Sequence, residues 1–168
     1  MSTDKNFTGR EGLDKLKELA TAADLCLFAT SLETEPIPAR PMSTRQVDEN
    51  GCIWFFSRST SKKNAEISKN NRVQLFYSNP GSAEFLNVSG KATIVIDQDK
   101  AKELWSAWAK AWFPEGTDDP ELTMIKVEPT HVYYWDTKHN RMVSLIKIVA
   151  AAISGQEMDD GIEGTIQV

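Results

Sequence analysis

A hydroxyl-rich, basic segment between an apolar run and a helical pattern is the part of this sequence best suited to chemistry. It reads Ser57-Arg58-Ser59-Thr60-Ser61-Lys62-Lys63. Such a segment can offer hydroxyl groups, free N–H groups at a helix start and two ammonium groups, which are the donors and charges that hold a phosphate. A solvated surface helix with a Ser/Thr cap is the alternative interpretation. The spacing alone leaves both interpretations open.

The distribution of charge supports a site for one small anion. The chain has 168 residues, with 19 Lys and Arg against 24 Asp and Glu, and a formal net charge of −5. Residues 40–72 nevertheless carry seven cations and three anions, a local charge of +4, which leaves −9 for the rest. Arg40 and Arg45 lie in this basic stretch, upstream of the hydroxyl-rich segment. An acidic chain with one basic stretch is a poor candidate for general nucleic-acid binding.

The elements that must position these groups follow from hydrophobic periodicity and turn residues. Leucines recur at helical spacing behind Thr8 and Glu11, which have the spacing of a capping box. Asn50-Gly51 is a strong hairpin signal, and it would pair the strand of Arg40 and Arg45 with the next one, so that the two cationic elements converge. In the first part of the chain we predict a helix over 9–22, a buried strand over 25–31, an edge or bulged strand over 38–47 and a strand over 52–57.

The second half of the chain continues with strands and one long helix. We predict a helix over 62–70, a strand over 72–78 and a strand over 85–96 with a bulge or bend at Gly90. A helix from an Asp97 cap through Trp112 follows, then strands over 122–127 and 131–136 and a last strand from about Met142. Trp105, Trp108 and Trp112 form a stripe on the long helix. Packing is favoured for this stripe over a cofactor box, and a place in a dimer interface or over a flavin is the alternative.

Several short strands with early hairpins, and helices without strict βαβ alternation, predict an α+β fold. The expected architecture is a closed or partly closed antiparallel β-barrel of about six to seven strands with flanking helices. Residues 156–168 contain four acids and no base, and they predict a flexible acidic tail behind a single domain over 1–155.

Four motifs in the same order and spacing resemble a known family. They are Ala39-Arg40-Pro41-Met42-Ser43-Thr44-Arg45, Trp54-Phe55-Phe56-Ser57, Ser61-Lys62-Lys63-Asn64-Ala65-Glu66-Ile67 and Asn71-Arg72-Val73-Gln74-Leu75-Phe76-Tyr77. They look like the FMN-binding split barrel of the pyridoxamine 5′-phosphate oxidase superfamily, and most of all its general stress protein 26 branch. The ordered match runs from about Leu13 to Ile148.

The resemblance implies an antiparallel split β-barrel that forms a homodimer with FMN, or alternatively FAD, at the subunit interface. It places Arg40 and Arg45 along the flavin and its phosphate, and the backbone around Pro41 and Met42 against the isoalloxazine. Phe56 would lie beside the ring system. The phosphate ligands would be Ser57, Ser61, Lys62 and Lys63. Trp135 is implied near the cofactor, although an ordinary barrel aromatic is the alternative.

One departure from the family bears on the substrate. The oxidases that make pyridoxal phosphate carry a C-terminal segment with an arginine for the substrate phosphate, whereas this chain has Gly155-Gln156-Glu157-Met158-Asp159-Asp160. Negative charge there would repel a phosphorylated substrate. The resemblance therefore favours the cofactor and disfavours pyridoxamine 5′-phosphate oxidase activity.

The resulting hypothesis is an FMN-binding, stress-related flavoprotein, an oxidoreductase that takes electrons from NADH or NADPH and passes them to an unknown acceptor. The alternatives are a flavin storage or sensing module without turnover, a split barrel that uses F420 or haem, and an interaction domain without a cofactor. No side chain is assigned a catalytic role, because the flavin carries the redox chemistry.

Other classes of site have little support in the sequence. His131 and His139 form no zinc motif, and no nucleophile elbow accompanies them. Cys26 and Cys52 indicate buried thiols in a reducing compartment. The N-terminus lacks the pattern of a secretory signal, and the longest apolar run is too short to span a bilayer. We therefore expect a cytoplasmic protein without a membrane partner.

Overall fold

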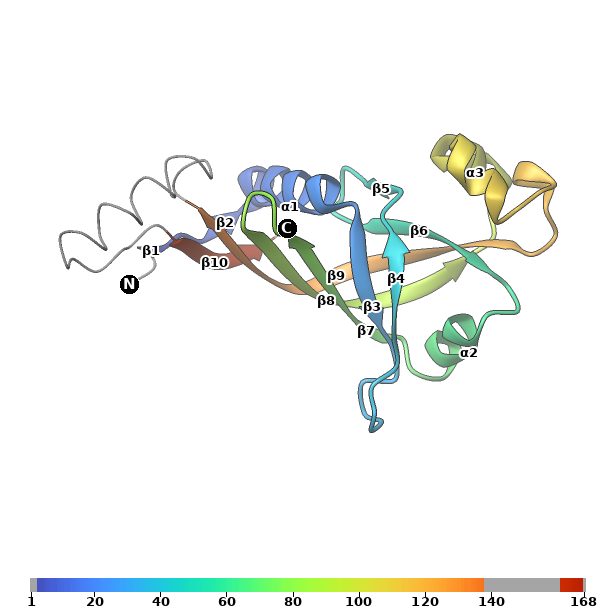
Figure 1. Cartoon of the computed structure of the whole chain (residues 1–168), viewed down its shortest axis with the longest axis horizontal. Helices are drawn as coiled ribbons and strands as arrows, with labels where there is room; N and C mark the ends of the chain where they lie inside the picture. The colour runs from blue at the N-terminus through green and yellow to red at the C-terminus, as the bar shows by residue number, and fades with distance from the viewer. Residues whose placement is uncertain (1–2, 138–160, 168) are drawn as a thin grey trace.

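The computed structural model describes residues 3–137 and 161–167 (Figure 1). The strands are β1 (Thr3–Asp4), β2 (Phe7–Thr8), β3 (Leu25–Ala29), β4 (Ala39–Ser43), β5 (Gln46–Val47), β6 (Ile53–Arg58), β7 (Arg72–Asn79), β8 (Glu84–Val95), β9 (Leu122–Thr137) and β10 (Gly161–Gln167). The helices are α1 (Gly9–Ala23), α2 (Lys62–Lys69) and α3 (Gln98–Leu104), with 3₁₀ turns at Ala107–Ala111 and Gly116–Asp118. The α+β class is confirmed.

One mixed sheet, antiparallel apart from two short pairings, curls into a barrel. Neighbouring strands follow the order β1-β10-β9-β8-β7-β3-β4, which makes β4 an edge strand, as Pro41 predicts. β9 also pairs with β6, and β6 pairs with β5. The segment over 39–47 therefore leaves β3 and reaches β6, and this crossing brings the two ends of the barrel sheet together.

The core consists of the inward side chains of these strands. Phe28 and Phe55 are fully buried and meet edge to face, with ring centroids 5.3 Å apart. Leu16 and Leu19 of α1 belong to the same core, which explains the leucine spacing of the helix. Both cysteines are buried free thiols, as predicted, and burial raises the pKa of Cys26 to about 12.

A second hydrophobic cluster lies outside the barrel. α3 and the 3₁₀ turns pack on β6 and β9 through the side chains of Cys52, Trp54, Ala101, Leu104, Phe113, Leu122 and Met124. The Asp97 side chain accepts a hydrogen bond from the Lys100 N–H and so caps α3, as predicted. The predicted cap of α1 is not realised in this way, because the Thr8 side chain makes no cap hydrogen bond.

The predicted helix through Trp112 is wrong beyond Leu104. Trp105 adopts an extended backbone, and its ring packs against Phe56 with centroids 5.8 Å apart, so this tertiary contact replaces the next helical turn. Trp108 and Trp112, which the prediction assigned to packing, are 84% and 68% exposed. Only Trp105 of the stripe lies against the second cluster.

The strands predicted on either side of Glu128-Pro129 are one strand, β9. Proline has no N–H for the ladder, and a register shift between Ser89 and Gly90 lies opposite Pro129. A Cβ at Gly90 would meet the Glu128 carbonyl oxygen at 2.7 Å, so the bulge also needs a glycine. The bulge or bend predicted at Gly90 coincides with this register shift, in which Thr130 of β9 is the extra residue.

The flexible tail predicted over 156–168 is wrong for its last part. Residues 161–167 form β10, which pairs antiparallel with β9 and parallel with β1 and β2. Ile166 is buried there, so apolar burial outweighs the acidic composition. Three other predictions fall outside the described residues. They concern the rest of the tail, His139, and the strand expected from about Met142.

The close contact between Gly12 of α1 and the backbone of β10 allows a test of whether β10 packs on this helix. Replacing a helical glycine by alanine ordinarily stabilises a protein by about 1 kcal/mol. Here the new Cβ would lie 2.6 Å from the Gln167 carbonyl oxygen. We expect Gly12→Ala to lower the free energy of unfolding by about 1–3 kcal/mol in urea titrations. An increase in stability would mean that β10 does not pack on α1.

Candidate functional site

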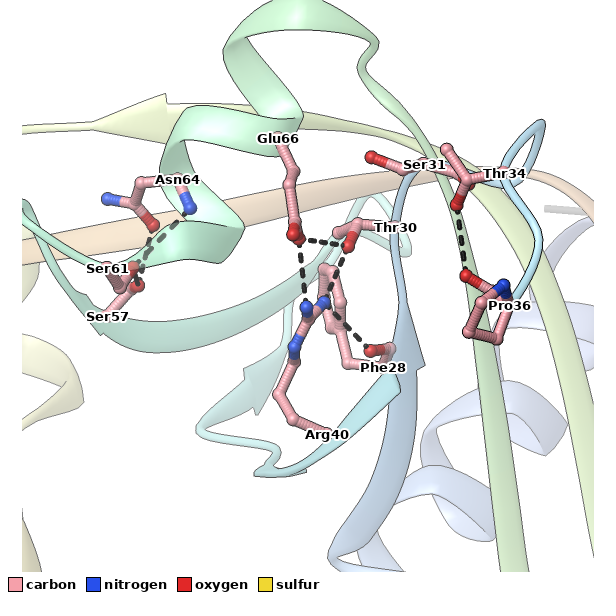
Figure 2. A network of polar contacts seen from close by, with 10 residues as sticks. All are labelled: Phe28, Thr30, Ser31, Thr34, Pro36, Arg40, Ser57, Ser61, Asn64 and Glu66. Carbon is pink, nitrogen blue, oxygen red and sulfur yellow. Dashed lines mark hydrogen bonds and ion pairs between the residues drawn. The ribbon is translucent and has the colours of Figure 1, made fainter. Parts of the chain in front are cut away.

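The start of α2 is held by a buried set of hydroxyl and amide groups. Ser61 is the N-cap, and its side chain accepts a hydrogen bond from the Asn64 N–H. The Ser57 hydroxyl donates to Asn64 Oδ1 at 2.6 Å, and Asn64 Nδ2 donates to Thr123 Oγ1 at 3.0 Å. Figure 2 shows Ser57, Ser61 and Asn64 together at this end of the helix. The hydroxyls predicted to bind phosphate thus also fix the helix start relative to β6 and β9.

Arg40 reaches α2 from β4 and ends in a network of its own. Its guanidinium donates to Thr30 Oγ1 at 2.6 Å, to the Phe28 carbonyl at 3.3 Å and to Glu66 Oε2 at 2.9 Å (Figure 2). Thr30 also donates to Glu66 Oε2 at 2.6 Å. This network ties β3 and β4 to the second turn of α2.

The charges around α2 affect one another. Burial lowers the pKa of Lys63, and Arg40 lowers it further, against the opposing effect of Glu66. Burial raises the pKa of the Glu66 carboxyl, but the Thr30 hydrogen bond and the charges of Arg40 and Lys62 outweigh it, so that its pKa lies below the usual value. The three cations and one carboxylate therefore form one electrostatic group along the first two turns of α2.

The lowered pKa of Glu66 predicts that its contribution to the free energy of unfolding depends on pH. A carboxyl whose pKa is lower in the folded than in the unfolded state stabilises the fold above the unfolded pKa and loses this effect as the pH falls through the folded pKa. At pH 7 we expect Glu66→Gln to cost about 1 kcal/mol in chemical denaturation. The difference from wild type should shrink as the pH falls below 4.5, the usual value. A difference that stays constant to pH 3 would contradict the ion pair.

Arg45 lies apart from this group, beside an aromatic pair. Its backbone N–H donates to the Trp54 carbonyl at 2.7 Å, and its guanidinium carbon lies 5.9 Å from the Phe56 ring centre. Phe56 in turn packs against Trp105. The Arg45 Nε is buried without a hydrogen-bond partner within the described residues. A polar ligand group beside Phe56 would satisfy it.

The remaining predicted residues face a groove on the outer surface of the sheet. Pro41 and Trp135 both line it, and Trp135 is 42% exposed. The groove has a volume of about 710 Å³ and also involves Leu25, Cys26, Leu27, Phe76, Tyr77, Ser78, Phe85, Leu86 and Asn87. Met42 lies on the same strand, but its side chain is in the core, which leaves its backbone for a ligand.

The hairpin was expected to bring both Arg40 and Arg45 beside β6, and this prediction is correct for Arg45 only. Gln46 and Val47 pair with β6 as the Asn50-Gly51 turn predicts, and Arg45 joins them through its backbone. Arg40 instead lies opposite Phe28, because β4 pairs with β3. The chain changes partner at Thr44, whose N–H donates to the Asp24 carbonyl. Arg40 reaches the second turn of α2 through its ion pair with Glu66 rather than through the hairpin.

Sequence reasoning missed four residues at this site. Thr30, Asn64, Glu66 and Thr123 make the hydrogen bonds that hold the predicted ligands. Glu66 carried the one available signal, since it follows Lys62 by four residues on the predicted helix.

Within the described residues no cluster of His, Cys, Asp or Glu fits a metal ion. Nor does any helix there have the length and apolar character that a membrane span requires.

A model of proteins described as pyridoxamine 5′-phosphate oxidase like matches residues 11–159, nearly the whole chain. The chain belongs to this family. Within it, the chain is 30% identical over 96 residues to general stress protein 26 of Bacillus subtilis, which covers 55% of this chain and 68% of that protein. The chain therefore falls in the general stress protein 26 branch of the pyridoxamine 5′-phosphate oxidase-like family.

Solved structures of the family share the split-barrel fold. A candidate general stress protein 26 from Jannaschia sp. CCS1 superposes with a TM-score of 0.73 at 22% identity, covering 93% of this chain and 95% of that chain. A general stress FMN/FAD binding protein from Xanthomonas citri superposes with a TM-score of 0.67 at 24% identity, covering 79% and 93%. The split barrel implied by the sequence motifs is confirmed.

Proposed function

We propose that this member of the pyridoxamine 5′-phosphate oxidase-like family binds FMN and passes electrons from a reduced nicotinamide to a small acceptor. The observation that carries the proposal is the grouping of three cations around α2: Lys62 and Lys63 open the capped helix, and Arg40 reaches its second turn from β4. A phosphate monoester needs this combination of cations, helix N–H groups and hydroxyls. FAD remains the alternative form of the cofactor.

The donor set fits the phosphate end of a flavin mononucleotide. Lys63 is half-buried, and its pKa is lowered first by this burial and then by the nearby charge of Arg40. A bound dianion would relieve that repulsion. Ser61 and the N–H groups of the first turn of α2 offer hydrogen bonds to the same group. Bound FMN supplies the hydride and electron chemistry.

We further propose that a second copy of the chain covers the groove of Pro41 and Trp135. Leu27, Phe76 and Trp135 are each exposed by 42–53%, and they lie on one sheet face, on β3, β7 and β9, with β8 between the last two. A contiguous apolar face of this kind favours association. A second copy would exclude water from the edge of β4, where the proposed isoalloxazine site lies.

The cytoplasmic location of the protein stays a prediction.

The first experiment identifies the cofactor. The purified protein is expected to show flavin absorbance in the visible range, and mass spectrometry of the released ligand is expected to give FMN. Protein purified without ligand should bind added FMN in a fluorescence titration. Preferential binding of F420 or haem, or no binding of FMN, would contradict the proposal.

The second experiment separates turnover from storage. Under anaerobic conditions, NADH or NADPH is expected to bleach the protein-bound flavin faster than free FMN in a stopped-flow spectrometer. Tight binding without such reduction would leave a flavin-binding protein and overturn the oxidoreductase part of the proposal. Pyridoxamine 5′-phosphate oxidase activity is not expected.

A further inference from the structure

We infer that Glu66 is an internal counter-ion of the phosphate site, one that stabilises the unliganded protein and weakens the binding of a phosphate. This inference rests on the proposed function and adds the residue that sets affinity at the same site. The carboxylate of Glu66 accepts hydrogen bonds from Thr30 and from Arg40, at 2.6 and 2.9 Å. Arg40 and Glu66 are each only 24% exposed, so water screens the pair incompletely.

Glu66 is the carboxylate that interacts with all three cations of the proposed phosphate site. It forms an ion pair with Arg40 and interacts electrostatically with Lys62 and Lys63. Neither lysine forms an ion pair with another described residue within 4.0 Å. Among the residues that the structure describes, the three cations proposed to hold phosphate thus share Glu66 as their negative partner.

A phosphate bound at the helix start would bring a second anion to the same cations. Part of the guanidinium of Arg40 is already bonded to Glu66, and the two anions repel each other across a partly buried site. Binding must therefore overcome the existing ion pair, the repulsion or both. Removing the charge of Glu66 while keeping its shape should strengthen phosphate binding and weaken the unliganded fold.

Glu66→Gln tests the inference with two measurements of opposite sign. The variant is expected to bind FMN about tenfold more tightly in fluorescence titrations, and to have a lower melting temperature than wild type when no ligand is bound. The rise in melting temperature on adding saturating FMN should be larger in the variant. A residue that only holds Arg40 in place would lower the affinity and the stability together.

Riboflavin and a second variant serve as controls. Riboflavin lacks the phosphate, so its affinity is expected to be the same in wild type and in Glu66→Gln. Glu18→Gln removes the same charge from an ion pair with Lys15 on α1, away from α2 in Figure 1, and it should leave FMN affinity unchanged. Equal or weaker FMN binding by Glu66→Gln, or equal tightening by Glu18→Gln, would overturn the inference. If wild type binds no FMN, the proposed function itself fails.

Discussion

Replacing Lys63 by alanine is expected to weaken FMN binding by about 1.5–3 kcal/mol, which is one to two orders of magnitude in Kd. The ammonium group is half-buried next to Arg40, so its charge is less screened than that of an exposed lysine. A charge-assisted hydrogen bond to phosphate would be lost with it. Lys62 is more exposed, and Lys62→Ala should have a smaller effect in the same direction.

The titration of these variants needs a lysine control on the same helix. Lys69 lies in the last turn of α2, at the opposite end from the cap, and Lys69→Ala should leave the affinity for FMN unchanged. Riboflavin affinity should change little in Lys63→Ala, because the phosphate carries the effect. Wild-type FMN affinity in both Lys62→Ala and Lys63→Ala would contradict the position of the phosphate.

Replacing Phe76 by aspartate is expected to convert the proposed homodimer to a monomer. Phe76 pairs with Leu27 across β7 and β3, and both lie on the exposed apolar face. In a two-fold interface each substitution occurs twice, so two unpaired carboxylates would be buried. The dimer dissociation constant should rise by roughly 100-fold or more. Light scattering coupled to size-exclusion chromatography measures the molar mass and so the change from dimer to monomer.

Ile96→Asp is the matched control for this experiment. Ile96 is also apolar and is 83% exposed, but it lies beyond the end of β8 and does not line the groove. This variant should keep the mass of wild type. FMN affinity should fall in Phe76→Asp if the flavin lies between subunits. A Phe76→Asp protein with the same mass as wild type would contradict the proposed interface.

The elements that the sequence predicts well are those with signals confined to a few neighbouring residues. Ser61 caps α2, Asp97 caps α3, and Asn50-Gly51 joins β5 to β6. Each depends on a hydrogen bond or a backbone geometry within one or two turns of chain, so the local sequence suffices.

The elements that the sequence misassigns depend on distant partners. The helix after Asp97 ends early because Trp105 packs on Phe56, 49 positions away in the chain. Residues 161–167 become a strand because β9 offers an edge for pairing. The acidic composition predicts solvation, but composition says nothing about a free strand edge.

The sequence by itself determined the α+β class, the basic stretch and the residue types of a phosphate site. Only the tertiary structure decided how those residues meet. Arg40 is joined to Glu66 and Thr30 across β3, β4 and α2, whereas Arg45 lies beside Phe56. The physical reason is range: periodicity and capping act over a few residues, but an ion pair between residues 26 positions apart forms only after the barrel brings its strands together.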